Sequence, residues 1–575
     1  MMKNSVKPVV LSVVLASLIF GLGAGGVAAP VVAAPTVPGG GTLTVCAWEE
    51  LTNLNPYACC ILGYDPIWGG ILQRLISFDP SGTSVPVLAK EVPTLQNGGL
   101  SKDGRTVTYH LRPDVKWADG TPFTSADVKF SYEYIMKPEN QVSSRAGFEL
   151  VENIETPDPL TAVVHFKRYY APWMTIPWFI IPKHILQKEP NFNKVDWDVK
   201  MLGTGPFYVT ESVAGDHLTL SKNPYYWEQG KPYLDQVIIL WVPDREAQKA
   251  RFRAGDCDMA VDLIETDIAA MKALPGVDVY IRTGGLVERL WLNLSANKGA
   301  NRGDPSHAHF FLGDIRVRQA LELAINKQEM VNTVLAGVNK VATSDCPGGW
   351  AQAALKPSRY DPARARELLQ QAGWVSASKD GIRECRGCKY GTPGDRASIT
   401  LRTTTAKFRQ LDAQLIQKYL RNVGVELNVE TPTGGLFWGG FNEGGLAATG
   451  SFDMDMWTEL CWVDPAPTLE QTYNSSQIPS SNNSAGRNKM RFVSQEFDQM
   501  LLQGASAISL QERAKAYKRA QEILVEQKPV IYLFERTDIT AIRSSRVKNW
   551  LAPYGKPNNW LSLANNFQNI YLAQK

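Results

Sequence analysis

Short stretches of this chain alternate hydrophobic and polar residues, and each such stretch predicts a half-buried β-strand. The clearest is residues 106–111, where Val107, Tyr109 and Leu111 alternate with two threonines and a histidine. Similar or fully apolar stretches predict further strands at Thr42–Ala47, Ala162–Phe166, Val237–Trp241, Arg289–Leu294, Ile399–Thr404, Val425–Val429 and Val530–Phe534. Short strands are therefore expected along the whole chain.

Helix start and stop signals lie between many of these strands. Capping-box patterns, which mark a helix start, occur at Thr124/Asp127, Asn326/Glu329 and Ser509/Glu512. Asp361 and Pro362 mark another helix start, and Gly373 marks the end of that helix. The helices are therefore expected to alternate with the strands.

Residues 399–429 combine these signals into one strand–helix–strand unit. An apolar stripe from Phe408 to Val423 predicts a helix that Gly424 ends, between the two strands of the unit. A unit of this size normally has parallel strands and a right-handed crossover. Together with the other elements, it predicts an α/β fold.

The N-terminus has the organisation of a secretory signal peptide. Lys3 and Lys7 precede an apolar run from Val9 to Leu22, and Ala29 and Ala34 are alternative ends of a cleavage site. The run is about 14 residues long, short of the roughly 20 that span a membrane, so we favour cleavage over an uncleaved anchor. Residues 1–35 are therefore predicted to be the signal peptide and the start of a linker. The predicted location is extracytoplasmic, in the periplasm or on the outer face of the cytoplasmic membrane.

Composition changes this picture in two ways. A formal net charge of +3 over 575 residues, with 44% hydrophobic and 20% charged residues, indicates a globular protein with no electrostatic case for nucleic-acid binding. Eight cysteines in a secreted chain predict disulfide bonds. Cys385 and Cys388 are expected to close a small loop, with a redox or metal pair as the alternative; the pairing of the other cysteines stays open.

An enzymatic function has little support in the sequence. The chain contains neither an HExxH zinc motif nor a GxSxG nucleophile elbow, and its six histidines supply few general bases. His307 and His309, in the segment SHAH, are read as part of a solvated loop rather than as metal ligands. We therefore predict no catalytic residue, no metal site and no cofactor.

Residues Asp103–Met136, DGRTVTYHLRPDVKWADGTPFTSADVKFSYEYIM, closely resemble the signature region of one protein family. This is family 5 of the extracytoplasmic solute-binding proteins, which serve peptide, dipeptide, oligopeptide and nickel ABC importers. Further matching blocks follow in the family's order: GTGPFYVTESVAGDHLTLSKNPYYWEQGKPYLDQV, ARFRAGDCDMAV, LGDIRVRQALELAINKQEMV, YDPARARELLQQAGW and RAQEILVEQKPVIYLF. The first cysteine, Cys46, lacks the lipobox pattern common among relatives, which leaves the membrane tether open.

The resemblance implies a two-lobed periplasmic-binding-protein fold (type II, cluster C) with an extra inserted domain and hinge strands. Domain I would be discontinuous, at about 36–77, 204–285 and 535–575. Domain II would be an insertion at 78–203, and domain III, the second lobe, would be 286–534. Ligand contacts made only in the closed state would favour closure of the lobes.

The resemblance also implies a ligand cleft in which the second lobe supplies an acidic anchor. In peptide-binding relatives an Asp three residues after a Trp holds the ligand's amino group. Here Trp457 matches that Trp, but Leu460 stands at the Asp position. We therefore expect Glu459 to take the role after a small register shift, with Asp464 as the other nearby carboxylate. Aromatic cleft residues are expected to be Trp438, Trp457, Trp462 and Tyr64.

The resemblance implies a monomeric, non-catalytic protein that captures a peptide or peptide-like solute. Its partners would be that solute and the permease subunits of an ABC importer in the membrane. Alternatives that keep the fold are binding of an oligosaccharide, a metal chelate or another organic solute, or a peptide sensor in place of a transporter component. The sequence does not identify the ligand.

Overall fold

The computed structural model describes residues 39–573, except 49, 52–53, 58–64, 80–82, 141, 143–144, 146, 177, 198–200, 377–378, 462–463 and 551–565. The predicted signal peptide lies outside the described residues. In the part of the chain that is described, no helix has the length and apolar character that crossing a membrane requires.

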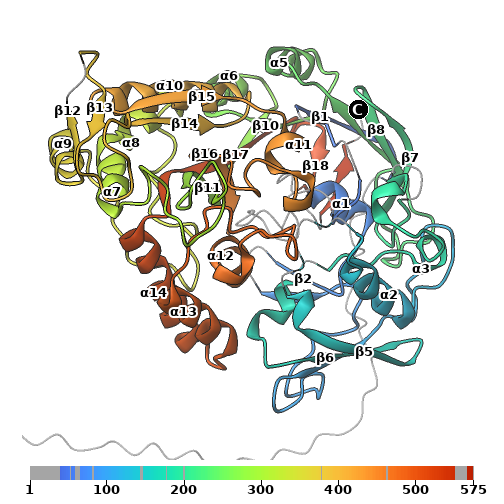
Figure 1. Cartoon of the computed structure of the whole chain (residues 1–575). Coiled ribbons are helices and arrows are strands. Elements are labelled where there is room, and N and C mark those ends of the chain that lie inside the picture. The colour runs from blue at the N-terminus through green and yellow to red at the C-terminus, as the bar shows by residue number, and fades with distance from the viewer. Residues whose placement is uncertain are drawn as a thin grey trace, which may run out of the picture. The chain divides into compact units, whose positions relative to one another are not determined.

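One mixed sheet runs through the described chain, in the strand order β15-β14-β16-β11-β17-β10-β1-β9-β8-β7 (Figure 1). Its strands are β1 (Thr42–Ala47), β7 (Phe207–Val213), β8 (His217–Lys222), β9 (Gln236–Trp241), β10 (Met259–Leu263), β11 (Asp278–Leu292), β14 (Ser398–Arg402), β15 (Glu426–Glu430), β16 (Met454–Leu460) and β17 (Val530–Ile542). The pair β14/β15 is parallel, which confirms the predicted strand–helix–strand unit.

Strands β11 and β17 join the two halves of this sheet. They pair antiparallel, with a register shift between Thr283 and Val287. One end of β17 pairs with β10, and the later part of β11 pairs with β16. Both strands are longer than predicted, at 15 and 13 residues. Polar residues such as Arg282 and Asp538 obscure the alternating pattern by which the sequence predicts a strand. They pair with each other across β11 and β17, so both strands continue through them.

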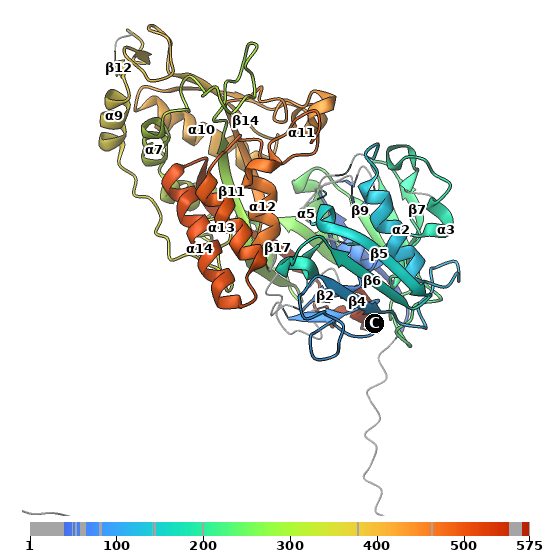
Figure 2. The same cartoon turned by 60° about the horizontal axis from the view of Figure 1, so that its bottom comes forward.

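Residues 76–194 form a separate layer. In the sequence they lie between β1 and β7, the first two strands of the large sheet. A three-stranded sheet, in the order β4-β6-β5, carries helix α2 against it (Figure 2). The elements are β2 (Ile76–Phe78), β3 (Ser84–Pro86), β4 (Thr106–His110), α2 (Ser125–Met136), β5 (Val151–Asp158), β6 (Thr161–Phe166), the 3₁₀ turn η2 (Ala171–Thr175) and α3 (Lys183–Leu186). Thr124 and Asp127 form the predicted capping box of α2.

The remaining helices cover the large sheet. The first half carries α1 (Asp65–Ile71), α5 (Arg245–Ala254), η4 (Glu265–Asp267) and α6 (Ile268–Lys272). The second half carries α7 (Ile315–Ala324), α8 (Lys327–Val334), α9 (Pro362–Gln371), α10 (Lys407–Arg421), α11 (Gly434–Trp438), η5 (Phe441–Glu443), α12 (Ala466–Tyr473), α13 (Gln495–Ser506) and α14 (Leu510–Gln527). Figure 2 shows α13 and α14 side by side. The described elements also include the small pairs β12/β13 (Trp374–Ser376, Arg383–Cys385) and β18/β19 (Val547–Lys548, Tyr571–Leu572). Short 3₁₀ turns lie at Phe148–Leu150, Phe192–Lys194, Ser475–Gln477 and Phe567–Asn569.

The predicted helix starts are confirmed at the level of individual hydrogen bonds. The side chains of Asn326, Asp361 and Ser509 each accept a hydrogen bond from a backbone N–H of the first helical turn. These caps satisfy donors that a helix cannot pair internally. Gly255, at the end of α5, has a φ of 95°, a conformation that glycine adopts without steric cost.

The hydrophobic cores divide the molecule into two lobes. One cluster lies mainly between Leu43 and Met259, through the insertion, and also takes in Ala505 of α13 and C-terminal residues from Ile542 to Leu572. A second, smaller cluster packs on the other side of β1 and β10 around Phe252. Two further clusters, around Phe311 and around Tyr517, belong entirely to residues 287–534. Each lobe thus has a largely separate core, with Ala505 of α13 packed into that of the first lobe, and the lobes share strands β11 and β17.

Disulfides Cys46–Cys257, Cys346–Cys461 and Cys385–Cys388 are present. The predicted small loop between Cys385 and Cys388 is confirmed. Cys59 and Cys60 lie outside the described residues.

Candidate functional site

Two tryptophans form an aromatic pair on the second lobe. Trp438 ends α11 and Trp457 lies in β16, and their ring centroids are 4.6 Å apart at an interplanar angle of 56°. The buried Trp291 supports Trp438 from behind, edge-on at 5.6 Å. Both members of the pair are partly exposed, so each keeps indole surface available for a ligand.

The glycine-rich segment around Trp438 folds tightly back on itself. Gly445 lies against Gly439, where a Cβ would come within 1.9 Å of the carbonyl oxygen of Gly439. Only glycine fits such a close backbone approach. The segment 439–445 therefore holds α11, and with it Trp438, on the rim of the lobe.

Two basic side chains lie over the tryptophan rings. The Lys489 ammonium is 4.7 Å from the centroid of Trp438, and the Arg409 guanidinium is 5.0 Å from that of Trp457. Cations at these distances interact favourably with the ring face. The aromatic pair is thus set in a positively charged surrounding.

Glu459 lies two residues after Trp457, on the same side of β16. Its carboxylate accepts hydrogen bonds from Arg289 at 2.8 Å and from Arg487 at 3.1 and 3.2 Å. Arg289 also pairs with the buried Asp345. Glu459 and Arg289 are both buried, at 6% and 0% exposure, whereas the Arg487 side chain is 28% exposed.

A second ionic cluster joins β11, β17 and the start of α10. Arg409 donates to Glu288 at 2.7 Å, and Arg536 lies 3.7 Å from the same carboxylate. Although burial opposes ionisation, these two guanidiniums hold the pKa of Glu288 below its usual range. Glu288 is therefore an ionised carboxylate at the point where the strands shared by the lobes enter the second lobe.

Two buried carboxyls beside these clusters lack hydrogen bonds. Both oxygens of Asp412 and one oxygen of Asp455 have no partner among the described residues. Burial raises the pKa of Asp455 to about 8 and raises that of Asp412 well above its usual value. Asp455 is therefore expected to be mainly protonated at neutral pH, and burial shifts Asp412 towards its protonated form as well.

The sequence-predicted site residues fall into three groups. Trp438, Trp457 and Glu459 come together in this region. Asp464 lies apart from Glu459, where it binds Arg513 at 2.6 Å and accepts from the first residue of α12. Trp462 and Tyr64 lie outside the described residues.

Sequence reasoning missed the basic residues of the site. Arg487 and Lys489 belong to a polar loop with no periodic pattern, so the sequence carries no signal for them. Glu288 and Arg289 did leave a signal, because two adjacent charges inside an otherwise apolar strand are unusual unless they are paired.

The two histidines of SHAH have different environments. His307 is exposed and contacts Asp304 at 2.9 Å, as a solvated loop residue would. His309 is fully buried and bonds to Asp453 at 2.9 Å, so the prediction of a solvated loop was wrong for this residue. Among the described residues, no group of three or more His, Cys, Asp or Glu side chains is arranged to hold a metal ion.

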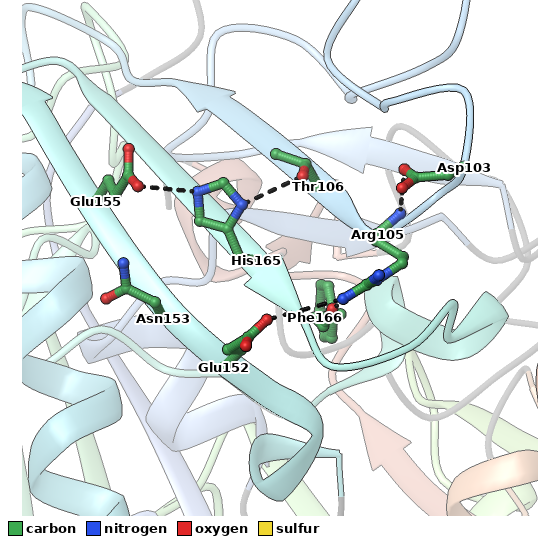
Figure 3. A pocket seen from close by; sticks show the side chains of 8 residues that line it. All are labelled: Asp103, Arg105, Thr106, Glu152, Asn153, Glu155, His165 and Phe166. Carbon is green, nitrogen blue, oxygen red and sulfur yellow. Dashed lines mark hydrogen bonds and ion pairs between the residues drawn. The ribbon is translucent and has the colours of Figure 1, made fainter.

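A polar depression lies on the outer face of the β4-β6-β5 sheet, away from the tryptophan pair (Figure 3). His165 stands at its centre, between Glu155 at 3.4 Å and Thr106 at 3.2 Å. Arg105 lies 3.8 Å from Glu152 at its other end. Its polar groups pair largely with one another, and it lacks the aromatic walls of the second-lobe site.

Comparison with known proteins places the chain in a family. The sequence profile of the bacterial extracellular solute-binding proteins, family 5 (middle region), matches residues 83–480. Protein XP55 of Streptomyces lividans is 29% identical over 67% of this chain and 66% of its own length. The glutathione-binding protein GsiB of Salmonella paratyphi A is 23% identical over 89% of this chain and 92% of its own length.

The fold is also similar to that of solved solute-binding proteins. The oligopeptide-binding protein AppA of Bacillus subtilis, solved in complex with a nonapeptide, superposes with a TM-score of 0.77 at 22% identity. The superposition covers 94% of this chain and 100% of that one. The two-lobed α/β architecture is therefore that of a periplasmic binding protein, and the chain belongs to family 5 of the bacterial extracellular solute-binding proteins.

Proposed function

We propose that this protein captures a peptide or peptide-like solute in the cleft between its lobes and delivers it to the permease of an ABC importer. The relatives support the solute class, since GsiB is named for glutathione and AppA was solved with a nonapeptide. The proposal has the protein act outside the cytoplasm, as a monomer, without catalysis or cofactor.

The observation that carries the proposal is the aromatic pair Trp438 and Trp457. Large aromatic side chains normally bury most of their surface, and two indoles held partly open on a rigid support suit stacking against a solute. The support here is the strand β16, the buried Trp291 and the glycine-rich turn after α11. A ligand bound there lies beside strands β11 and β17, through which closure of the lobes would act.

The lobes would move as the domains that the resemblance implies. Domain I would comprise about 36–77, 204–285 and 535–575, domain II 78–203 and domain III 286–534. Largely separate hydrophobic cores on either side of β11 and β17 support this division. A solute that contacts both lobes would favour the closed state by the free energy of the contacts made only there.

A thermal-shift screen tests the proposal. The purified protein, unfolded and refolded to remove any bound solute, is heated with short peptides, oligosaccharides, amino-acid derivatives and nickel chelates. A ligand at 100 times its dissociation constant should stabilise the protein by about 2.7 kcal/mol. Peptide hits support the proposal; hits restricted to sugars or chelates would keep the binding role and reject the peptide class.

The substitution Trp457→Ala tests whether the ligand binds at the aromatic pair. It should weaken binding of the best peptide by about tenfold or more, as expected for loss of a central aromatic contact. Tyr390→Ala is the control, because Tyr390 is an exposed aromatic residue (41%) outside the site. Equal affinities of the two variants would move the ligand away from the aromatic pair.

A further inference from the structure

The carboxylate of Glu459 is already occupied. One oxygen accepts from Arg289 at 2.8 Å and Arg487 at 3.1 Å, and the other accepts from Arg487 at 3.2 Å and from the backbone N–H of Leu460 at 3.3 Å. A ligand ammonium would have to displace a guanidinium from this carboxylate. Charge-assisted pairs of this kind are among the stronger hydrogen bonds in proteins, so displacement is unfavourable.

Arg487 is the outermost member of this network. Its side chain is 28% exposed, whereas those of Glu459 and Arg289 are 7% and 0% exposed. The next residue, Asn488, is buried and donates to three backbone carbonyls, those of Tyr473, Asn474 and Phe492. The backbone at Arg487 is therefore fixed, and its guanidinium is held in place before any ligand arrives.

The same loop brings a second cation to the aromatic pair. Lys489, two residues after Arg487, lies over the ring of Trp438. Glu459, which binds Arg487, shares its side of β16 with Trp457. Arg487 and Lys489 thus flank the surface that Trp438 and Trp457 present.

The charges around this surface do not balance. Four arginines, Arg289, Arg409, Arg487 and Arg536, pair with three carboxylates, Glu288, Asp345 and Glu459. Asp412 and Asp455 add little negative charge, because a buried carboxyl group without hydrogen-bond partners is held in its neutral form. The region therefore carries an excess of positive charge.

We propose that the solute presents a carboxylate, rather than an ammonium, to the second lobe, and that Arg487 receives it beside Trp438 and Trp457. The inference rests on the proposed function and names the chemistry of the solute. Arg487 directs one terminal nitrogen to Glu459 and the other to Gln471 at 3.2 Å, which leaves further N–H donors on its guanidinium. Such donors can bind a planar terminal carboxylate through two parallel N–H···O bonds without loss of the pair with Glu459. Lys489 adds attraction for the same charge, while the indoles contact the apolar part of the solute.

Matched probes test the inference on the unaltered protein. The tripeptide Ala-Phe-Ala, its C-terminal amide and its N-acetyl derivative are titrated calorimetrically, together with 3-phenylpropionate, a carboxylate without a peptide bond. Amidation should weaken binding by about tenfold or more, since it removes a charged hydrogen bond. Acetylation, which removes only the ammonium, should change affinity by less than about threefold.

The variant Arg487→Gln gives a second readout. It should reduce the affinity for the free acid by about tenfold and leave the affinity for the amide unchanged, which a merely structural role would not do. Arg364→Gln is the matched control, because Arg364 is an exposed, ion-paired arginine on α9. If Arg487→Gln fails to fold, the affinities of the unaltered protein for the free acid and for the C-terminal amide still test the inference.

The outcomes separate this inference from the proposed function. Equal affinity for acid and amide, or loss of binding on acetylation alone, overturns the inference while the peptide role stands. Binding of phenylpropionate through Arg487 without binding of any peptide supports the inference and rejects the peptide class. Failure of all four probes to bind overturns both.

Discussion

The carboxylate of Glu459 lies between two guanidiniums, and this pairing sets the chemistry of the second-lobe site. Arg289 is fully buried and shared with Asp345, so it is fixed from the core side. Arg487 approaches from the loop and remains partly exposed. Under the proposal that Arg487 receives the solute, Glu459 is a positioning residue that holds Arg487 at the surface.

Glu459→Gln separates this role from that of an ammonium anchor. The substitution should lower the free energy of unfolding by about 1–3 kcal/mol, because the charged hydrogen bonds from Arg289 and Arg487 are weakened. Affinity for a carboxylate solute should be retained or increased, since a negative charge is removed. Denaturant unfolding and calorimetric titration measure the two effects. A tenfold loss of affinity that is confined to solutes with a free ammonium group would restore the anchor role.

Asp455 gives the site a pH-dependent stability. Its pKa rises with burial from the ordinary 3.8 to about 8, so the folded protein keeps a proton that the unfolded chain releases. Stability should therefore fall as pH rises between these two values, by at most about 1.4 kcal/mol per pH unit from this group. Asp455→Asn should flatten that slope in denaturant unfolding and stabilise the protein most near pH 8. An unchanged slope would show that Asp455 is ionised in the fold.

At this scale the sequence singled out residues that the fold brings together and missed their partners, while their role in solute binding stays a prediction. Trp438, Trp457 and Glu459 follow from their positions in a family-like segment. Arg289 reaches Glu459 across 170 positions of sequence, and no local pattern encodes such a contact. Asp464 shows the converse, since a carboxylate near the right segment is committed to Arg513.

At the scale of the elements, the carboxylate of Glu265 links both lobes to the shared strand β17. Glu265, in η4 of the first lobe, accepts from Thr537 of β17 at 2.6 Å and from Asn339, which follows α8 of the second lobe, at 3.0 Å. Asn339 also donates to the backbone of Glu535 at 2.7 Å. This group therefore couples both lobes to β17.

Asn339→Ala should loosen this coupling. Loss of the amide leaves Glu265 and a strand carbonyl short of a donor, which should lower the free energy of unfolding by about 1–3 kcal/mol. Solute affinity should change as well, because the balance of open and closed states moves. Denaturant unfolding and calorimetric titration follow the two effects, with Asn428→Ala, an exposed asparagine on β15, as the control. Effects of equal size in both variants would argue against a coupling role.

The elements themselves were largely predictable because their signals are local. Caps such as Asp361 and Ser509 act within one helical turn, so the sequence displays them directly. The early part of β11 was missed, because Gly284 and Gly285 and the paired polar residues interrupt the apolar pattern.

At the scale of the whole molecule, a second contact joins the insertion to the second lobe. Tyr170, which precedes η2, donates from its hydroxyl to Glu470 of α12 at 3.3 Å. Burial raises the pKa of Glu470 to about 8, where Arg168 opposes the shift and Asp464 and Glu149 add to it. The contact is therefore made by a protonated carboxyl group at neutral pH.

This contact should weaken with rising pH. The pKa of Glu470 is about 8 in this structure, and separation of the lobes should expose the carboxyl group and move its pKa towards the ordinary 4.5. The joined state therefore binds more protons. The joined state should lose stability as pH rises through this window. Small-angle X-ray scattering of the protein without solute should show expansion near pH 8 and above. Glu470→Gln, which cannot ionise, should remove the pH dependence; its persistence would assign the effect to another group.

The two-lobed arrangement was predicted only through family resemblance. Periodicity predicted an α/β fold, but it contains no information on which strands become neighbours across 250 residues of sequence. The pairing of β11 with β17 is such a contact. It is fixed by tertiary packing of apolar strand faces rather than by any local pattern.

Capture of a solute against Trp438 and Trp457 is the central claim, and calorimetric titration of the refolded, solute-free protein tests it most directly. Short peptides with a free carboxylate are titrated into the unaltered protein and into Trp457→Ala. We predict saturable binding to the unaltered protein, weakened about tenfold or more by the substitution. Absence of binding to the unaltered protein, or equal affinity in both, would contradict the account.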